Sequence, residues 1–596
     1  VRLDLPLAHL GQTRVDGRYR VVGNDLAFVE GMPPLREIAG ELRFTGDRLE
    51  ARQVRGTMLG APMTLDLATE GGGIALRAAG SATVRDLRQH FGFAALADVA
   101  GTAPWSALLN VREGVADLRV ESSLQGVSSS LPEPFNKTAA DRMALLVERR
   151  AATGAGDQWK VRLGDTAQLT LMRRLEQGRL VVDRGLAAIG PVEARLPERG
   201  LGLAVNARRL DADLWRRRMA TDNGGATSGA SSLPPLGRVD LRVDEFLVHG
   251  RTIHDLQLDG THDGSVWKMA IKSKEAVGRV EWTDQGAGRL SGRLSRLDLP
   301  EGVEGNASAQ AADAADDLPA VDLMVENFSL HGKPFGELSL KAENIDRIWS
   351  ARFDIKNDDG ELEGKGRWRP ARGAMPATTA IDFSLTARSL EDLLARFGYP
   401  GTVRRGTATL AGALTWAGPP TTVDYPSLDG QLTLEAARGQ FKKLEPGVGR
   451  LLGVISLQSL PRRISLDFRD VFSEGFAFDS IAGRMSVKQG IMATSDFQIQ
   501  GPSAKVLMNG SVDLARETQD LKVRVQPALG ETVATGVLLV NPAVGAAAWL
   551  MNKVFGNPLD KAFAFDYAVT GAWADPKVEK LAVQGPRAAS EEKVTQ

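Results

Sequence analysis

The sequence predicts a mainly β fold, a long, curved and twisted antiparallel β-sheet array that forms an open hydrophobic groove. Three observations support this. Apolar and polar residues alternate with period two along most of the chain. Glycine, with 64 of 596 residues, recurs where turns are expected. A stretch of strand-like sequence also recurs further along the chain, as expected of stacked units. Because alternate side chains of a strand point to opposite faces, one face of the sheet is expected to be apolar and the other charged.

The composition excludes several functional classes. The chain has 73 basic and 74 acidic residues, and this balance leaves no electrostatic footprint for nucleic acid. It has no cysteine, which excludes disulfides, thiolate metal sites and a cysteine nucleophile. We therefore expect no nucleic-acid partner.

The alternation is clearest near the C-terminus, at Leu521, Val523 and Val525, which are separated by basic residues. Asn509-Gly510 and Gln489-Gly490 predict hairpin turns, because these dipeptides tolerate the positive φ of a tight turn. The apolar positions are candidates for lining the groove. These candidates are Leu241, Val243, Leu256, Leu258, Leu323, Val325, Leu338, Leu340, Phe353, Ile355, Met485, Val487, Phe497, Ile499, Val506, Met508, Val512, Leu514, Leu521, Val523 and Val525.

An internal repeat supports an array of similar units. Val239–Val243 recurs as Val321–Val325, an offset of 82 residues, and the same offset relates Trp267 to Trp349 without a gap. Each unit is expected to contain several antiparallel strands followed by a short crossover. Repeats of this kind bury their apolar faces by stacking on one another.

We divide the chain into three segments. Residues 1–235 are expected to form a β-groove segment with a short helix near 84–92, residues 236–392 the repeated β units, and residues 393–596 a C-terminal β segment. Segments 219–235 and 302–317, rich in small and polar residues, and the tail after residue 586 are expected to be flexible.

Short helices are expected at the crossovers. Ser389 can cap a helix that contains Asp392 at the capping-box position, and Gly398 suits the end of that helix. Val84, Asp86 and Leu87 lead in a similar way to Gly92.

One segment near the C-terminus is not strand-like. Between Glu531 and Lys553 lie 21 residues without a formal charge, interrupted by Asn541-Pro542, and we expect a helical pair over 531–556 hinged near the proline. Three interpretations stay open: packing against the end of the sheet, docking on a membrane surface, or a membrane span. The membrane-docking candidates are Val537, Leu538, Leu539, Val540, Trp549, Leu550, Val554 and Phe555.

The sequence offers no catalytic or metal-binding motif. His249, His254 and His262 lie close in sequence, but no carboxylate or thiolate completes a ligand set at motif spacing. Gly286-Ala287-Gly288 lacks the spacing and the helix of a dinucleotide loop, and no G-x-S-x-G elbow occurs. We expect no enzyme activity, no cofactor and no metal.

Several motifs together resemble the AsmA-like family in its YhdP branch. They are Asp470–Asp479, Val540-Asn541-Pro542, Gly571–Pro576, Leu124–Pro134 and Gly101–Trp105, and the resemblance is densest from about Leu393 to Pro576. It implies a bridge-like lipid transfer protein with an open β-groove that crosses the periplasm of a Gram-negative bacterium. Family members carry an N-terminal anchor helix in the inner membrane. No such helix appears in this sequence, so we expect a C-terminal portion of a longer protein.

The expected function is therefore conduction of phospholipid acyl chains along the groove between inner and outer membranes, which supports the permeability barrier. Each methylene kept from water contributes about 0.8 kcal/mol, so a continuous groove lowers the barrier to lipid extraction. The expected partners are phospholipids, both membranes and an envelope protein. The alternative is a scaffold for assembly of outer-membrane proteins, which would use its sheet edges for strand addition. A carbohydrate-active β-solenoid enzyme would need clustered acids, which the repeat does not align.

Overall fold

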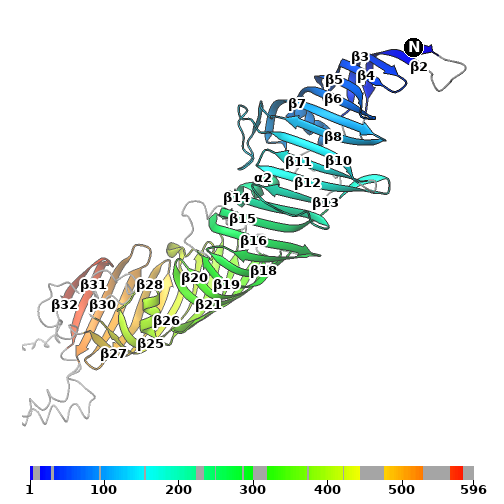
Figure 1. Cartoon of the computed structure of the whole chain (residues 1–596). Coiled ribbons are helices and arrows are strands. Elements are labelled where there is room, and N and C mark those ends of the chain that lie inside the picture. The colour runs from blue at the N-terminus through cyan, green and yellow to red at the C-terminus, as the bar shows by residue number, and fades with distance from the viewer. Residues whose placement is uncertain are drawn as a thin grey trace, which may run out of the picture. The chain divides into compact units, whose positions relative to one another are not determined.

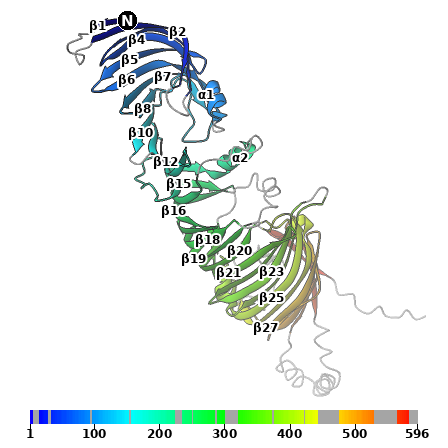
Figure 2. The same ribbon diagram turned by 90° about the vertical axis from the view of Figure 1, so that its right-hand side faces the viewer.

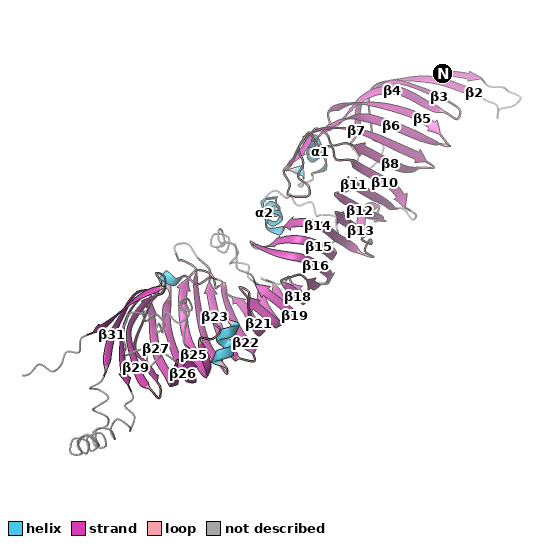
Figure 3. Cartoon of the chain, turned by 60° about the vertical axis from the view of Figure 1, so that its left-hand side comes forward, coloured by secondary structure: helices cyan, strands magenta, loops and turns pink. Residues whose placement is uncertain are grey.

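A computed structural model describes residues 1–4, 14–27, 33–92, 96–152, 156–222, 234–248, 250–284, 288–299, 319–371, 375–420, 422–442, 475–527 and 564–581. It divides into two compact units, Val1–Arg279 and Val280–Gln596. Both are mainly β, and the described helices are few and short (Figure 1, Figure 3). The mainly β fold is thus confirmed. The three-segment division stays a prediction.

In unit 1 the strands follow one another across the sheet in chain order, with one exception. They are β1 (Arg2–Asp4), β2 (Arg14–Leu26), β3 (Leu35–Thr45), β4 (Leu49–Met58), β5 (Ala61–Glu70), β6 (Gly73–Thr83), β7 (Val99–Arg112), β8 (Val115–Ser122), β9 (Val127–Ser129), β10 (Leu145–Ala152), β11 (Gly156–Leu163), β12 (Ala167–Glu176), β13 (Arg179–Ile189), β14 (Gly200–Asp211), β15 (Leu236–Val248), β16 (Arg251–Asp263) and β17 (Val266–Lys272). The exception is β9, which pairs with the first residues of β7, so that β10 pairs with β8. The unit boundary falls inside β18 (Ala276–Thr283).

Unit 2 repeats this sequential order. Its strands are β19 (Arg289–Leu299), β20 (Ala320–Leu330), β21 (Lys333–Ile345), β22 (Ile348–Asn357), β23 (Gly360–Arg369), β24 (Thr378–Ala387), β25 (Val403–Ala417), β26 (Asp429–Phe441), β27 (Phe476–Lys488), β28 (Ile491–Gln500), β29 (Ala504–Asp513), β30 (Thr518–Pro527), β31 (Phe565–Ala572) and β32 (Asp575–Leu581). The strands from β20 to β27 form a curved wall (Figure 2).

Most neighbouring strands are antiparallel, but three of the pairs whose register is described are parallel: β13–β14, β14–β15 and β19–β20. A parallel pair cannot be joined by a tight hairpin, so the chain must cross back between its two strands. These crossings follow β13, β14 and β19, and only residues 190–199, 212–222, 234–235 and 319 of them lie in the described part. The helices that we predicted at crossovers, near 84–92 and after Ser389, lie elsewhere, between the antiparallel strands of the pairs β6–β7 and β24–β25.

The short helices begin and end where the capping residues predict. In α1 (Val84–Phe91) the side chain of Thr83 accepts a hydrogen bond from the backbone N–H of Asp86, and Gly92 ends the helix in the left-handed region. In α4 (Leu390–Arg396) Ser389 accepts in the same way from Asp392. A third helix, α2 (Ala212–Asp222), extends into the segment expected to be a loop from residue 219, and residues 223–233 lie outside the described part.

The sequence repeat is also a repeat of strand register. Val243 of β15 lies opposite Leu256 of β16, and 82 residues later Val325 of β20 lies opposite Leu338 of β21. β15 and β20 each also pair in parallel with the preceding strand. The shared pattern of apolar residues therefore specifies the same local pairing in both units.

One predicted hairpin turn is confirmed and the other is wrong. Gln489 and Gly490, both with positive φ, join β27 to β28. Asn509-Gly510 lies inside β29 instead, which pairs along its length with β28 and β30. Gly510 is needed there because a Cβ on it would lie 2.2 Å from the carbonyl oxygen of Asp520. A glycine in a strand can thus mark a close backbone approach as well as a turn.

Bulges bend several strands. At register shifts in β3 and β4, Glu37 and Gln53 adopt positive φ, and each donates its backbone N–H to a nearby carboxylate, from Asp25 and Asp66 respectively. An extra residue in one strand increases local twist and bends the sheet. The acidic side chain satisfies the N–H that the bulge removes from the ladder.

Candidate functional site

One face of unit 2 carries an unbroken row of apolar side chains. Each residue lies directly opposite the next on the neighbouring strand, from β19 to β26. The row consists of Leu294, Val325, Leu338, Ile355, Leu362, Leu385, Leu410 and Leu434. We call this face the apolar face of unit 2. It includes the candidates Leu323, Leu340 and Phe353 in the adjacent row.

The row one residue along carries polar side chains on the opposite face. It runs through Glu337, Lys356, Glu361, Thr386, Thr409 and Glu435. Lys356 forms ion pairs with Asp354 at 3.2 Å and Glu361 at 2.9 Å, and hydrogen bonds to these carboxylates raise the pKa of Lys356. On β30, Arg524 holds Asp566 with bonds of 2.7 and 2.9 Å, and this hydrogen bonding lowers the pKa of Asp566.

The row on the apolar face of unit 2 is least covered in its middle part, since Leu294, Val325 and Leu338 on β19 to β21 are buried. Ile355, Leu385 and Leu410 are half-buried. On β27 to β30 the side chains form a buried cluster, in which Ile499 and Val506 are both 0% exposed. The candidates Met485, Val487, Phe497, Met508, Val512, Leu521, Val523 and Val525 belong to this cluster, and Leu514 packs against it from the following turn.

Unit 1 has a similar apolar row that the candidate residues do not include. It runs from β4 to β15 through Val54, Leu65, Ala78, Ala107, Val120, Val147, Val161, Leu169, Ala187, Leu203 and Val239. We call this face the apolar face of unit 1. Its signal was present in the sequence, since Met63, Leu65 and Leu67 alternate with polar residues. Further along, the candidates Leu241 and Leu258 lie opposite one another, as do Val243 and Leu256.

A charged cluster interrupts the apolar face of unit 1. Asp157 of β11 is fully buried and accepts hydrogen bonds from Arg149 at 2.8 Å and from Arg173 at 2.7 and 2.6 Å. Trp159 Nε1 also donates to Asp157 at 3.3 Å, and the Arg173 guanidinium lies 5.3 Å from the centre of the Trp159 ring. Burial raises the pKa of Asp157, but the hydrogen bonds and charges of the two arginines outweigh it and hold the pKa below its usual value.

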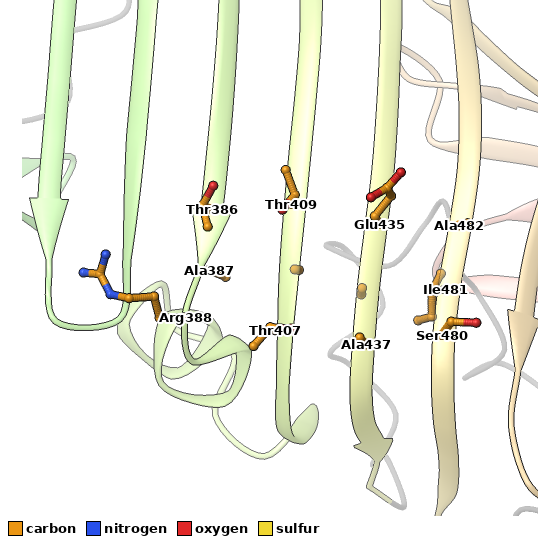
Figure 4. A pocket seen from close by; sticks show the side chains of 12 residues that line it. Thr386, Ala387, Arg388, Thr407, Thr409, Glu435, Ala437, Ser480, Ile481 and Ala482 are labelled. Atoms are coloured by element: carbon orange, nitrogen blue, oxygen red, sulfur yellow. The ribbon is translucent and has the colours of Figure 1, made fainter.

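A hollow of about 510 Å³ lies on β24 to β27 (Figure 4). Its central row, Ala387, Ala408, Ala436 and Ile481, consists mostly of alanines, which leave the space unfilled. Arg388 and Glu435 are the charged residues of its lining. This hollow offers space of ligand size but no cluster of reactive groups.

The four histidines of the described part have separate surroundings, and the ring of His90 packs edge-on against Phe91. His254 Nδ1 lies 2.6 Å from Glu275, His262 stacks on Trp267, and His331 is exposed in a turn. His249 lies outside the described residues. Within the described ranges, no three acidic or histidine side chains gather as a metal site would require.

The membrane-docking candidates Val537 to Val540, Trp549, Leu550, Val554 and Phe555 all lie outside the described residues, as does the helical pair predicted over 531–556. Their role stays a prediction from the sequence. Among the helices that the structure describes, none has the length and hydropathy to cross a bilayer.

Comparisons with known proteins identify the family of this chain. The "Intermembrane phospholipid transporter YhdP" of Escherichia coli (strain K12) is 23% identical over 98% of this chain. The chain spans about half of that relative, 47% of its length. No solved structure matches the chain. The model of the YhdP protein family matches residues 1–578, and the chain therefore belongs to the YhdP family.

Proposed function

We propose that this chain conducts phospholipids between two membranes by holding their acyl chains against its apolar faces. The observation that carries this proposal is the row from Leu294 to Leu434, apolar at every position across eight strands and half-buried from Ile355 onward. An acyl chain on this row would exchange water for side chains. Each methylene so transferred contributes about 0.8 kcal/mol.

The polar row on the opposite face of the sheet also supports this proposal. Charged residues such as Lys356 and Glu361 keep that face in water, so a lipid would have one apolar side of the sheet to follow. Acyl chains present no polar groups, so the wall needs to exclude water but needs no specific hydrogen bonds. Transfer of this kind breaks no covalent bond, and we propose no catalytic residue.

Our proposal that the two membranes are those of the cell envelope rests on the name of the relative from Escherichia coli. Its name, an intermembrane phospholipid transporter, supports a place in the cell envelope, with the chain in the periplasm between inner and outer membranes. Supply of phospholipid to the outer membrane would support its permeability barrier. The relative is about twice as long as the part that this chain matches. We propose that the full-length protein is anchored in the inner membrane.

Site-specific photocrosslinking on matched positions tests the proposal. A photoreactive amino acid at Ile355 or Leu410 would lie in the apolar row. One at the adjacent residue of the same strand, Lys356 or Thr409, would lie in the polar row on the opposite face. We expect phospholipid adducts, identified by mass spectrometry of protein from cells, at the first pair and few at the second.

Equal lipid adducts on both faces would contradict a groove, since they would indicate non-specific contact with membranes. Protein adducts at Ile355 and Leu410 in place of lipid would favour the scaffold for outer-membrane proteins. Positions Met508 and Val523, which are 3% and 5% exposed, extend the same measurement to the buried part of the face.

A further inference from the structure

We propose that the cluster of Arg149, Asp157 and Arg173 is a binding site for the phosphate group of a phospholipid on the apolar face of unit 1. This inference rests on the proposed function, because it needs a lipid to lie along that face. It adds a binding site for the phosphate of the headgroup, whereas the apolar rows bind the acyl chains.

The position of the cluster is the first argument. Arg149 lies in a cross-strand row with Leu118 on one side and Trp159 on the other, and Leu171 follows Trp159. Asp157 and Arg173 lie opposite each other in the next row of the same face. These side chains therefore point to the same side as the apolar residues, where a bound acyl chain would lie.

The charge of the cluster is the second argument. Two guanidinium groups share one carboxylate, which leaves a surplus of one positive charge on an otherwise apolar surface. No other carboxylate forms an ion pair with Arg149 or Arg173 in the described part of the chain. Apolar residues of similar size would hold these strands together without the cost of desolvating charges, so the fold itself does not require the cluster.

The unused donors are the third argument. Arg149 donates through Nε to Asp157 and through Nη1 to the carbonyl oxygen of Ala116, and Arg173 donates through Nε and Nη2 to Asp157. Arg149 Nη2 and Arg173 Nη1 have no partner among the described residues. The two arginine side chains remain 14% and 23% exposed, whereas Asp157 is 0% exposed. Asp157 thus orients two guanidinium groups whose remaining N–H donors suit the oxygens of a phosphate.

The surrounding side chains suit the rest of a phospholipid. Val147, Val161, Leu169 and Leu171 are half-buried on the same face, and the Trp159 ring lies beside the arginines. A lipid whose phosphate met the two arginines could place its acyl chains on this apolar surface. The site would then retain lipids that carry a phosphate over lipids that carry none.

The test compares two lipids with identical acyl chains, dioleoylphosphatidylglycerol and dioleoylglycerol, each presented in neutral detergent micelles to the full chain. A photoreactive amino acid replaces Leu171, beside the cluster, or Leu67, on the same face at β5. At Leu171 we expect about tenfold more adduct with the phospholipid, which corresponds to about one charge-assisted hydrogen bond. At Leu67 we expect similar yields for the two lipids.

Matched variants separate the cluster from general charge. Arg173→Met and Arg149→Met each leave Asp157 paired with one arginine, and each should remove most of the preference at Leu171. Arg150→Met removes a charge from the neighbouring residue, whose side chain is 68% exposed, and should leave the preference intact. Unchanged adduct yield at Leu67 shows that each variant is folded.

Equal yields of the two lipids at Leu171, or a preference that survives both arginine variants, would overturn the headgroup site while leaving lipid conduction in place. Absence of adducts at Leu171 and Leu67 alike would instead count against the proposed function. Equilibrium dialysis with inorganic phosphate alone distinguishes the source of the phosphate. Tight binding of free phosphate without any lipid preference would overturn a lipid headgroup as the ligand.

Discussion

At the scale of single residues, the most informative group is a buried carboxylate on an apolar face. Asp157 is fully buried on the apolar face of unit 1, and its two oxygens are held by Arg149 and Arg173. A buried charge of this kind is stable only while its partners remain. The contribution of Asp157 to stability can therefore be tested by a substitution that removes its charge and keeps its shape.

We expect Asp157→Asn to lower the free energy of unfolding of unit 1 by about 3 kcal/mol, because it leaves two partly buried guanidinium groups without a counter-charge. Urea unfolding at neutral pH measures the change. Asp165→Asn, on an exposed turn between β11 and β12, is the control and should change the stability by less than about 0.5 kcal/mol. An equal, small effect of both substitutions would contradict the assignment.

The same carboxylate predicts a pH dependence. The pKa of Asp157 is lowered in the folded protein, so its stabilisation is fully present above the unfolded value of about 3.9 and is lost as pH falls toward the folded value. The stability difference between the wild type and Asp157→Asn should shrink by about 1 kcal/mol between pH 5 and pH 3. Urea titrations of both proteins measure it, and a difference that stays constant or grows would show that the folded pKa is not lowered.

At the scale of elements, glycines have two distinct roles, one in the turns between strands and one within the strands. Gly332 lies in the turn between β20 and β21, and a Cβ there would meet no atom within 4 Å. Gly510 lies inside β29, where a Cβ would overlap the backbone of β30. The first position restricts only the backbone conformation, whereas the second also restricts the space between two strands.

We therefore expect Gly510→Ala to destabilise unit 2 more than Gly332→Ala. The turn substitution should cost about 1 to 2 kcal/mol, the cost of a left-handed conformation for an ordinary residue. The strand substitution should cost about 2 kcal/mol more, because β29 and β30 must move apart. Thermal or urea unfolding of unit 2 in the full chain measures both, and equal costs would mean that Asn509-Gly510 behaves as a turn.

At the scale of the whole molecule, function depends on rows that cross many strands. Leu385 and Leu410 are opposite one another in the apolar row of unit 2, and Thr386 and Thr409 are opposite one another in the polar row. A charge in the first row would obstruct acyl chains, whereas a charge in the second row would remain in water.

We expect the double substitution Leu385→Asp with Leu410→Asp to reduce the phospholipid that copurifies with the protein by about tenfold, because acyl chains do not compensate the desolvation of carboxylates. Thr386→Asp with Thr409→Asp introduces the same charges on the polar face and should leave the bound lipid unchanged. Mass spectrometry of extracted lipid, with circular dichroism as a check of folding, measures both. Equal lipid content in the two variants would contradict conduction along this face.

Part of this protein was determined by the sequence itself. Period-two alternation predicted the β fold and the shared face of Leu338 and Ile355, because a strand has no other way to place alternate side chains. The capping pattern at Ser389 predicted α4, since that interaction is local. The repeat predicted similar units, and the two hairpins β15–β16 and β20–β21 share the pairing of Val243 with Leu256 and of Val325 with Leu338.

Other features were decided only by tertiary structure. The row from Leu294 to Leu434 depends on the register of eight strands, and bulges shift that register elsewhere in ways that residue patterns do not reveal. Asn509-Gly510 predicts a turn from the sequence, and only the pairing of β29 with β28 and β30 shows that it lies inside a strand. Arg149, Asp157 and Arg173 lie up to 24 residues apart and look like ordinary surface charges in the sequence. Pairing of β10, β11 and β12 brings them together on the apolar face, because contacts between strands join residues that the chain itself keeps apart.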